Sequence, residues 1–346
     1  MNIRAWLERV DPGTHRRIKG LRLVTAYGIA WMMGTLEGRS IQLPGHNSLS
    51  ALAAGFALWA SVSEGRTTRA ASSRDLLLLV LAAVFGAATM MDLAPILARV
   101  GRVGPEFTLV IGAFCVAYLK PVGILAAGLG SQFYIGQLLA YGVGSTPNDL
   151  AVVAIAGLIA AVAAIVPRLV SGPAEHPGLP APTASDAKAE RRSPGLRMGL
   201  QAAAAALVIV VCNEWFGLEK SAWAVTACTY VIAGTMSGTV ERVLRRIVGT
   251  AIGVPLGLAC LPFALHLPFL ICIAAAVAMV VYAMALPERY DIACGAYAFA
   301  LIVTMAVQGE SSVIMLVSRA WETLIGGALG LATAMLIFPL RARQPR

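Results

Sequence analysis

Long apolar blocks separated by short charged breaks constrain this chain more than any other feature. Segments 202–211 and 271–285 are continuously apolar. A run of about 18 or more apolar residues with few charges is typical of a membrane-spanning helix. Only helices and closed barrels satisfy every backbone group in lipid, and these blocks lack the alternating pattern of barrel strands. We therefore predict an all-α, polytopic transmembrane helix bundle.

Composition agrees with a membrane protein and argues against an enzyme. Hydrophobic residues make up 58% of the chain and charged residues 13%, against about 25% charged residues in soluble proteins. The six cysteines lie in or at the ends of apolar blocks without a CxxC pair, and the four histidines are scattered. A membrane-embedded enzyme would need a clustered His, Asp or Cys constellation. We predict no catalytic residue, no metal site and no cofactor.

Twelve apolar blocks are recognisable, and we predict twelve spans, with ten as the lower bound. A Pro-, Ala- and Ser-rich segment at 171–195 has no apolar period and is predicted to be a disordered cytoplasmic linker. It separates a first transmembrane repeat at 20–170 from a second at 196–340, with tails at 1–19 and 341–346. The predicted blocks are 20–37, 48–63, 75–91, 105–119, 122–142, 149–170, 198–216, 221–238, 246–264, 267–286, 290–307 and 320–339.

Basic residues predict the orientation of these spans, because cytoplasmic loops carry an excess of Lys and Arg. With the N-terminus inside, most of the 27 basic residues face the cytoplasm. We therefore predict that both termini are cytoplasmic. The net charge of +9 is then explained by topology and anionic lipid rather than by nucleic acid. The basic residues left outside are Arg39, Arg99, Arg102, Lys220 and Arg319.

The two sides of the linker resemble each other in the order of the charged residues, loops and proline turns that separate their apolar blocks. Leu21-Arg22 opens the first block and Leu196-Arg197 opens the seventh, and segment 48–65 is similar to 220–238. Each half continues with a basic cytoplasmic loop and later a proline turn. Six spans per half make both halves enter the membrane from the same side. This predicts two parallel six-helix repeats related by an axis along the membrane normal.

A more specific resemblance lies in the second half. The stretch 241–250 (ERVLRRIVGT) is followed by Gly253 and Gly257, and Trp223 precedes it within SAWAVTACTYVIAG. These residues and the closing segment 318–339 resemble the fusaric-acid-resistance (FUSC) family, which is related to the aromatic acid exporters. The first half matches weakly, because it lacks the Gly-Thr pair. The chain resembles a short member without the large cytoplasmic domains.

The resemblance implies secondary-active efflux of aromatic carboxylic acids or similar weak organic acids across a bacterial inner membrane. It implies proton coupling, since the sequence contains no P-loop pattern, and a separately encoded periplasmic adaptor as partner. Two other functions stay open, namely a non-transporting membrane assembly or regulatory subunit and a passive anion channel. A homo-oligomer is also left open.

Charges in or near the spans are the candidate coupling residues. Glu322 lies near the start of the last predicted span, one turn from Arg319, and forms an intrahelical ion pair or couples proton and substrate. Arg245 and Arg246 anchor the cytoplasmic end, or form an anion-attracting vestibule in which Arg246 contacts a carboxylate directly. Asp92, Glu214 and Trp223 complete the candidates, and Asp92 and Glu214 are equally consistent with the outer interface.

Small and aromatic residues form two further patterns in the second half. Gly249, Thr250, Gly253 and Gly257 share one helix face, and Gly326 and Gly330 repeat the spacing. Such stripes allow close helix packing or a sliding surface for alternating access. A set of aromatic residues stacks on an aromatic substrate or packs the core. This set is Trp223, Tyr230, Tyr282, Tyr290, Tyr297 and Phe299.

Overall fold

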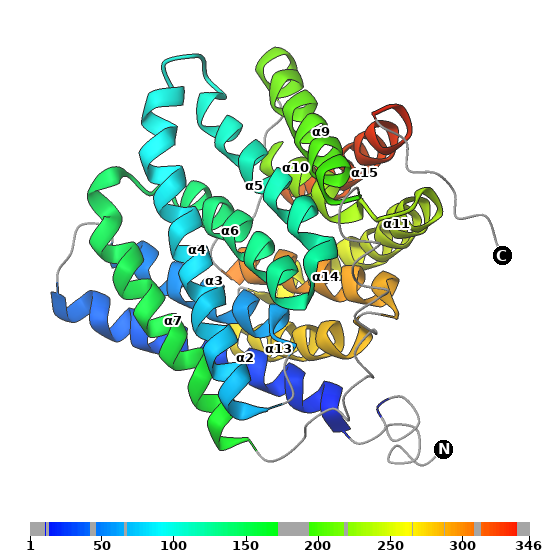
Figure 1. Ribbon diagram of the computed structural model, residues 1–346. Coiled ribbons are helices and arrows are strands. Elements are labelled where there is room, and N and C mark those ends of the chain that lie inside the picture. The colour runs from blue at the N-terminus through cyan, green and yellow to red at the C-terminus, as the bar shows by residue number, and fades with distance from the viewer. Residues whose placement is uncertain are drawn as a thin grey trace, which may run out of the picture.

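Helices account for the architecture, as the apolar blocks predict. The computed structural model describes residues 11, 14–41, 46–65, 68–171, 194–217, 221–264, 266–286, 288–307 and 313–337. Within these ranges the chain contains helices, turns and bends and no strand (Figure 1). The prediction of an all-α fold is therefore confirmed.

In the described part of the chain, twelve helices of more than ten residues occupy the twelve predicted blocks. The first half holds α2 (His15–Ile41), α3 (His46–Ser63), α4 (Arg69–Leu97), α5 (Phe107–Leu119), α6 (Ile124–Gly142) and α7 (Leu150–Val170). The second holds α9 (Pro194–Phe216), α10 (Ser221–Val231), α11 (Met236–Ala259), α13 (Pro268–Ala285), α14 (Tyr290–Val307) and α15 (Val313–Leu336). Short turns η2 (Gly104–Glu106), η3 (Lys120–Val122), η4 (Pro147–Asp149) and α12 (Leu261–Ala264) join them.

Two predicted boundaries were wrong in ways that affect candidate residues. Arg246 was predicted at the start of a span, at the edge of a basic loop, but it lies inside α11, because Thr235 caps that helix eleven residues earlier. Glu322 was predicted near the start of the last span but lies in the middle of α15, which begins at Val313. Most of the predicted linker, 172–193, lies outside the described residues.

Seven of the described helical segments are long and apolar enough to cross a membrane, and Ser48–Ser63 and Ala320–Leu336 form shorter apolar helices. Many large apolar side chains also point outward, among them Phe85, Trp215 and Phe269. Such a surface suits lipid rather than water. The chain is therefore a multi-pass membrane protein. The seven segments are Arg69–Leu97, Gly104–Val122, Pro147–Val170, Gly195–Phe216, Met236–Phe263, Pro268–Ala285 and Tyr290–Val307.

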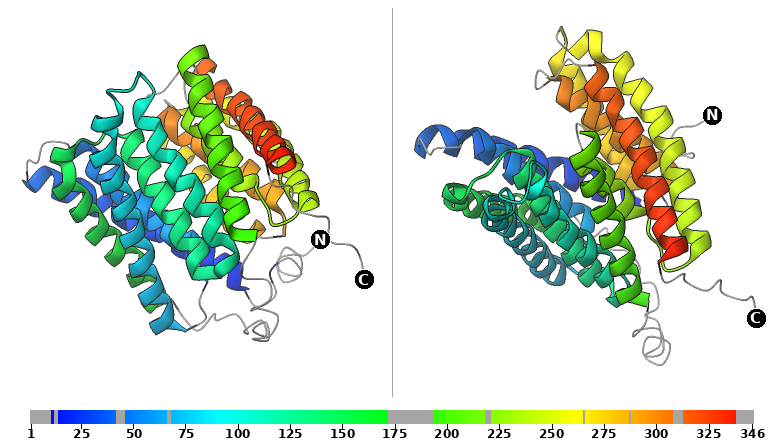
Figure 2. Two further views of the ribbon diagram at one scale, coloured as in Figure 1. Left: turned by 45° about the horizontal axis from the view of Figure 1, so that its top comes forward. Right: turned by 90° about the horizontal axis from the view of Figure 1, so that it is seen from above.

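The same helix pairings recur in both halves. In the first half α4 packs against α6 and α7, α3 against α7, and α5 against α6. In the second half α11 packs against α14 and α15, α10 against α15, and α13 against α14. The halves meet through α5 on α9 and through α13 on α2. Figure 2 shows the blue-to-green and yellow-to-red helices as two neighbouring groups, with α9 between them.

The helix ends form two groups at opposite ends of the molecule. Lys19 Nζ near the start of α2 donates to Glu64 O after α3 at 2.7 Å, and Lys120 Nζ after α5 donates to Ile232 O after α10 at 2.6 Å. We call this end the basic end. At the opposite end, Arg102 after α4 donates to Asn213 O near the end of α9 at 2.8 Å. The basic end collects the helix ends that the sequence predicts to be cytoplasmic.

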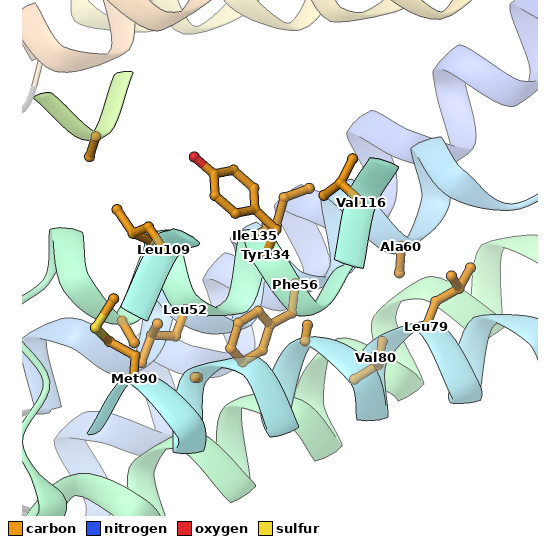
Figure 3. Close-up of a cluster of buried hydrophobic side chains, with 14 of the residues drawn as sticks. Leu52, Phe56, Ala60, Leu79, Val80, Met90, Leu109, Val116, Tyr134 and Ile135 are labelled. Carbon is orange, nitrogen blue, oxygen red and sulfur yellow. The ribbon is translucent and has the colours of Figure 1, made fainter. Parts of the chain in front are cut away.

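The core of the first half is built from small and medium side chains that let these helices approach closely. Phe56, Leu79 and Val80 are at most 1% exposed and belong to one buried cluster (Figure 3). Tyr134 is also fully buried, but Figure 3 shows its hydroxyl directed away from Phe56. The hydroxyl bonds Thr226 of α10, so this core continues into the contact between the halves.

Matched N-caps begin the third long helix of each half, and we predict that removing either destabilises the protein. Thr68 Oγ1 accepts from Ala71 N at 3.4 Å and Thr235 Oγ1 accepts from Gly238 N at 3.2 Å. Loss of such a cap costs about 0.5–2 kcal/mol. Thermal unfolding in detergent should therefore show lower midpoints for Thr68→Ala and Thr235→Ala. The control Thr25→Ala, an exposed mid-helix threonine, should match the wild type, and equal midpoints for all variants would contradict the capping role.

Candidate functional site

Arg246 occupies the contact between the halves, near the basic end. It lies ten residues after the start of α11, and its NH1 donates to the Tyr290 hydroxyl at 3.2 Å. Its Nε is buried and, among the described residues, has no hydrogen-bond partner. A guanidinium presents a fixed fork of donors that matches a carboxylate. Arg246 therefore has one buried donor that no described residue accepts.

An aromatic cluster with rings from both halves adjoins Arg246 through Tyr297, which interacts with the guanidinium. Trp59 of α3 meets Tyr297 of α14 edge-on with centroids 5.4 Å apart, and Tyr282 of α13 at 6.2 Å. Tyr282 and Tyr297 are 6.1 Å apart. All three rings are only half-buried. Ring edges attract ring faces, so these three rings form a cluster that joins α3 to α13 and α14.

Two hydroxyl pairs extend the site into the first half. Tyr230 of α10 bonds Ser131 of α6 at 2.6 Å, and Tyr134 of α6 bonds Thr226 of α10 at 2.8 Å. Tyr134 and Tyr230 also lie edge to face, with centroids 6.2 Å apart. Both interact electrostatically with Arg246. We call the set of Trp59, Tyr230, Arg246, Tyr282, Tyr290 and Tyr297 the Arg246 site.

The glycine face of α11 positions Arg246 against α14. A Cβ added at Gly249 would overlap the Asp291 carbonyl oxygen, and one at Gly253 would overlap that of Gly295. The two helices are thus in backbone contact one to two turns from Arg246, and this contact holds the guanidinium beside Tyr290. Thr250 is buried on α11, and Gly257 packs on Ile302.

Arg245 makes different contacts from Arg246. Its guanidinium pairs with Glu241 at 2.5 Å and donates to the Glu288 carbonyl oxygen at 2.5 Å. The side chain is partly exposed, so the pairing contributes little to stability. Arg245 ties α11 to the turn between α13 and α14, at the rim of the Arg246 site.

The remaining predicted residues do not belong to this set. Glu322 is 2% exposed within α15; the Arg319 side chain lies outside the described residues. Trp223 precedes Tyr230 by seven residues on α10, about 10 Å along the helix. Asp92 and Glu214 are exposed at the opposite end. Gly326 and Gly330 lie where α15 crosses α10, against Ala224 and Cys228.

Sequence reasoning missed a second polar centre around Glu106. This carboxylate in η2 is 5% exposed. It accepts hydrogen bonds from Tyr141 at 2.8 Å, from Asn213 at 3.0 Å to each oxygen, and from Ser221 at 2.5 Å. Tyr141 belongs to the first half, whereas Asn213 and Ser221 belong to the second. The available signal was an acidic residue inside the predicted block 105–119, which is costly in a membrane.

A small pocket at the basic end is lined by charges of both signs. Lys19, Arg22 and Arg168 face Glu64 across it. Arg22 donates to Ser171 at 2.5 Å and Arg168 donates to Ser72 at 3.0 Å. These bonds join the ends of α2, α4 and α7, and Lys19 joins α2 to the end of α3. The charged groups of this pocket therefore hold helix ends together at the basic end. Among the described residues no three His, Cys, Asp or Glu side chains come together as metal ligands.

Comparison with known proteins bears on the second half of the chain. Residues 204–333 match the model of a family described as fusaric acid resistance protein-like. No curated protein and no solved structure matches the chain. The matched stretch contains α10, α11, α13, α14 and most of α15. It therefore includes Arg246 and four of the site tyrosines, whereas Trp59 and Glu106 come from outside it.

Proposed function

Because residues 204–333 belong to the fusaric acid resistance protein-like family, we propose a transport function. In this proposal the membrane protein exports aromatic carboxylic acids or similar weak organic acids by secondary-active transport. One observation carries the proposal. Arg246 keeps a buried Nε without a hydrogen-bond partner among the described residues, beside aromatic rings from both halves. A guanidinium beside aromatic rings complements both the carboxylate and the ring of an aromatic acid.

The proposed substrate binds with its carboxylate on Arg246 and its ring against Trp59, Tyr282 and Tyr297. Charge-assisted hydrogen bonds are stronger than neutral ones, and exclusion of water strengthens them further. Edge-to-face contacts then favour an aromatic ring over an aliphatic ring of similar size. The site thus accounts for both the charge and the aromatic class of the substrate.

In this proposal the basic end faces the cytoplasm, and the substrate enters the protein from that side. The residues at that end include Lys19, Arg22, Arg69 and Lys120, and such an excess marks the cytoplasmic side. An organic anion is attracted to this end and reaches Arg246 next. This orientation places both termini in the cytoplasm of a bacterium, and it leaves the opposite end for a periplasmic adaptor.

Alternating access in this proposal comes from movement between two parallel six-helix repeats. The shared helix pairings of the two halves support a repeated unit, and so do the reciprocal contacts of α5 with α9 and α13 with α2. Transporters built from repeats commonly bind substrate between them and rock one against the other. The Arg246 site lies at such a contact, because Trp59 comes from one half and Arg246 from the other.

Replacing Trp59 tests the aromatic part of the site. In Trp59→Leu, affinity for radiolabelled hydroxybenzoate should fall about two- to tenfold, since an aromatic pair is worth about 0.5–1.5 kcal/mol. Affinity for cyclohexanecarboxylate should change little. Binding is measured on purified protein by scintillation proximity, with competition by the unlabelled acid. The control Trp215→Leu, 82% exposed at the end of α9, should bind as the wild type does; equal losses for both acids in Trp59→Leu would refute ring stacking.

A further inference from the structure

Glu106 joins the two halves at the end of the molecule opposite the Arg246 site. Its carboxylate is bonded by Tyr141 from α6 and by Asn213 and Ser221 from α9 and α10. All three donors are electrically neutral. An ionisable group within a membrane-spanning segment is costly and is a functional candidate by default. We call these four residues the Glu106 latch.

The partners of Glu106 can hold it with or without a proton. The hydroxyls of Tyr141 and Ser221 can donate to a carboxylate, and after rotation they can accept from a protonated carboxyl group. The Oδ1 atom of Asn213 is buried and, among the described residues, has no hydrogen-bond partner. Rotation of that amide would present an acceptor to a carboxyl O–H. The latch can therefore bind one proton and keep its polar atoms satisfied.

The charged groups around the latch lie nearer the surface than Glu106. Arg102 bonds the carbonyl oxygen of Asn213 at 2.8 Å, and the exposed Glu214 accepts from Val103 N at 3.0 Å. Neither is among the hydrogen-bond partners of the Glu106 carboxylate. Glu106 is thus the buried acid of this part of the molecule. Among the described residues, the other charged groups of this end include Glu37, Asp92, Arg99 and Asp149, of which Glu37, Asp92 and Arg99 are exposed.

Hydroxyl groups recur between the latch and the Arg246 site. Along α10, Ser221 bonds Glu106, Thr226 bonds Tyr134, and Tyr230 bonds Ser131. Tyr230 in turn interacts with Arg246. Successive hydroxyls on α10 are four or five residues apart, which is about 6–8 Å along the helix. We call this row the α6–α10 seam, and it connects the two polar centres through the contact between the halves.

We propose that Glu106 is the proton-binding carboxylate of the transport cycle. This inference rests on the proposed efflux function. A proton from the outer side converts the carboxylate to a carboxylic acid. The hydrogen bonds of the latch are then satisfied but no longer charge-assisted, so they are weaker, and the halves separate at that end while the substrate anion leaves. The proton then leaves Glu106 through the seam to the cytoplasmic side, and the restored carboxylate closes the latch. One proton enters for each anion exported.

Transport by proteoliposomes tests this role. Glu106→Gln keeps hydrogen bonding but cannot cycle a proton, so it should lose pH-gradient-driven transport of radiolabelled hydroxybenzoate and retain substrate exchange without a gradient. Glu214→Gln, the neighbouring exposed carboxylate, should behave as the wild type in both assays. Gradient-driven transport retained by Glu106→Gln would overturn the proposal. So would loss of that transport in Glu322→Gln alone, or loss of exchange as well in a folded Glu106→Gln protein.

An infrared readout separates this inference from the efflux proposal. Acidifying the full-length protein should produce the C=O band of a protonated carboxyl group, and this band should be missing in Glu106→Gln. A wild type that shows the band without transporting hydroxybenzoate would refute the efflux proposal while supporting proton binding at Glu106. A band unchanged in Glu106→Gln would overturn the inference. Ser221→Ala, which keeps the carboxylate, should still show the band; its absence from a folded Ser221→Ala protein would contradict the assignment to Glu106.

Discussion

Arg246→Gln should lower affinity for hydroxybenzoate about 10- to 150-fold, because a hydrogen bond to a charged group is worth about 1.5–3 kcal/mol. Arg246 supplies the charge of the site through a buried Nε and through NH1, which bonds Tyr290. The amide nitrogen of glutamine can still donate hydrogen bonds, but it provides no charge. Binding is measured on purified protein, and efflux from cells should fall with it.

Two matched variants separate the fork of Arg246 from general positive charge. Arg246→Lys keeps the charge but loses the planar pair of donors, so its affinity should lie between those of the wild type and Arg246→Gln. Arg245→Gln removes the adjacent arginine, which bonds Glu241 and the Glu288 backbone, and should bind as the wild type does. If Arg245→Gln weakened binding as much as Arg246→Gln, positive charge in general would attract the anion, and the assignment of Arg246 as the carboxylate-binding residue would be wrong.

Gly253→Val should destabilise the protein by about 1–3 kcal/mol or more, the usual cost of overpacking. A side chain at Gly253 meets the carbonyl oxygen of Gly295, which is backbone and cannot rotate away. Helices α11 and α14 would have to separate, and Arg246 would move from Tyr290. Thermal unfolding in detergent should show a lower midpoint, and hydroxybenzoate binding should be lost in the folded fraction.

The glycine of α2 provides the control for this substitution. Gly28 is exposed, and a Cβ added there meets no atom within 4 Å. Gly28→Val should therefore unfold at the wild-type midpoint or slightly above it, since valine has a higher helix propensity than glycine. A Gly253→Val protein as stable as Gly28→Val would show that α11 and α14 are not in backbone contact.

The helices were predictable because each apolar block is a local property of the chain. The length and low charge of segment 271–285, for example, can be read without knowing what it contacts. Within the described residues, a helix is present in each of the twelve blocks. Boundaries were less predictable where polar residues continue a helix. Segment 239–245 looks like a loop by hydropathy, yet it lies within α11, which Thr235 caps.

The candidate site was predictable only in part, because half of it depends on contacts between distant segments. Arg246 and the tyrosines of α13 and α14 lie close in sequence, within a region with a family resemblance. Trp59 lies far away in a half that carries only a weak resemblance, and nothing local marks it as a neighbour of Tyr297. Glu106 was similarly hidden, since its partners Asn213 and Ser221 follow more than a hundred residues later.

The central claim is coupled export of an aromatic acid through the Arg246 site, and efflux of radiolabelled hydroxybenzoate from cells expressing this chain tests it most directly. The wild type should export the acid faster than cells with an empty vector, a protonophore should abolish the difference, and Arg246→Gln should export at the empty-vector rate. Efflux that persists with the protonophore would indicate a passive anion channel. Efflux equal to the empty vector, with the wild-type protein present in the membrane, would contradict the claim.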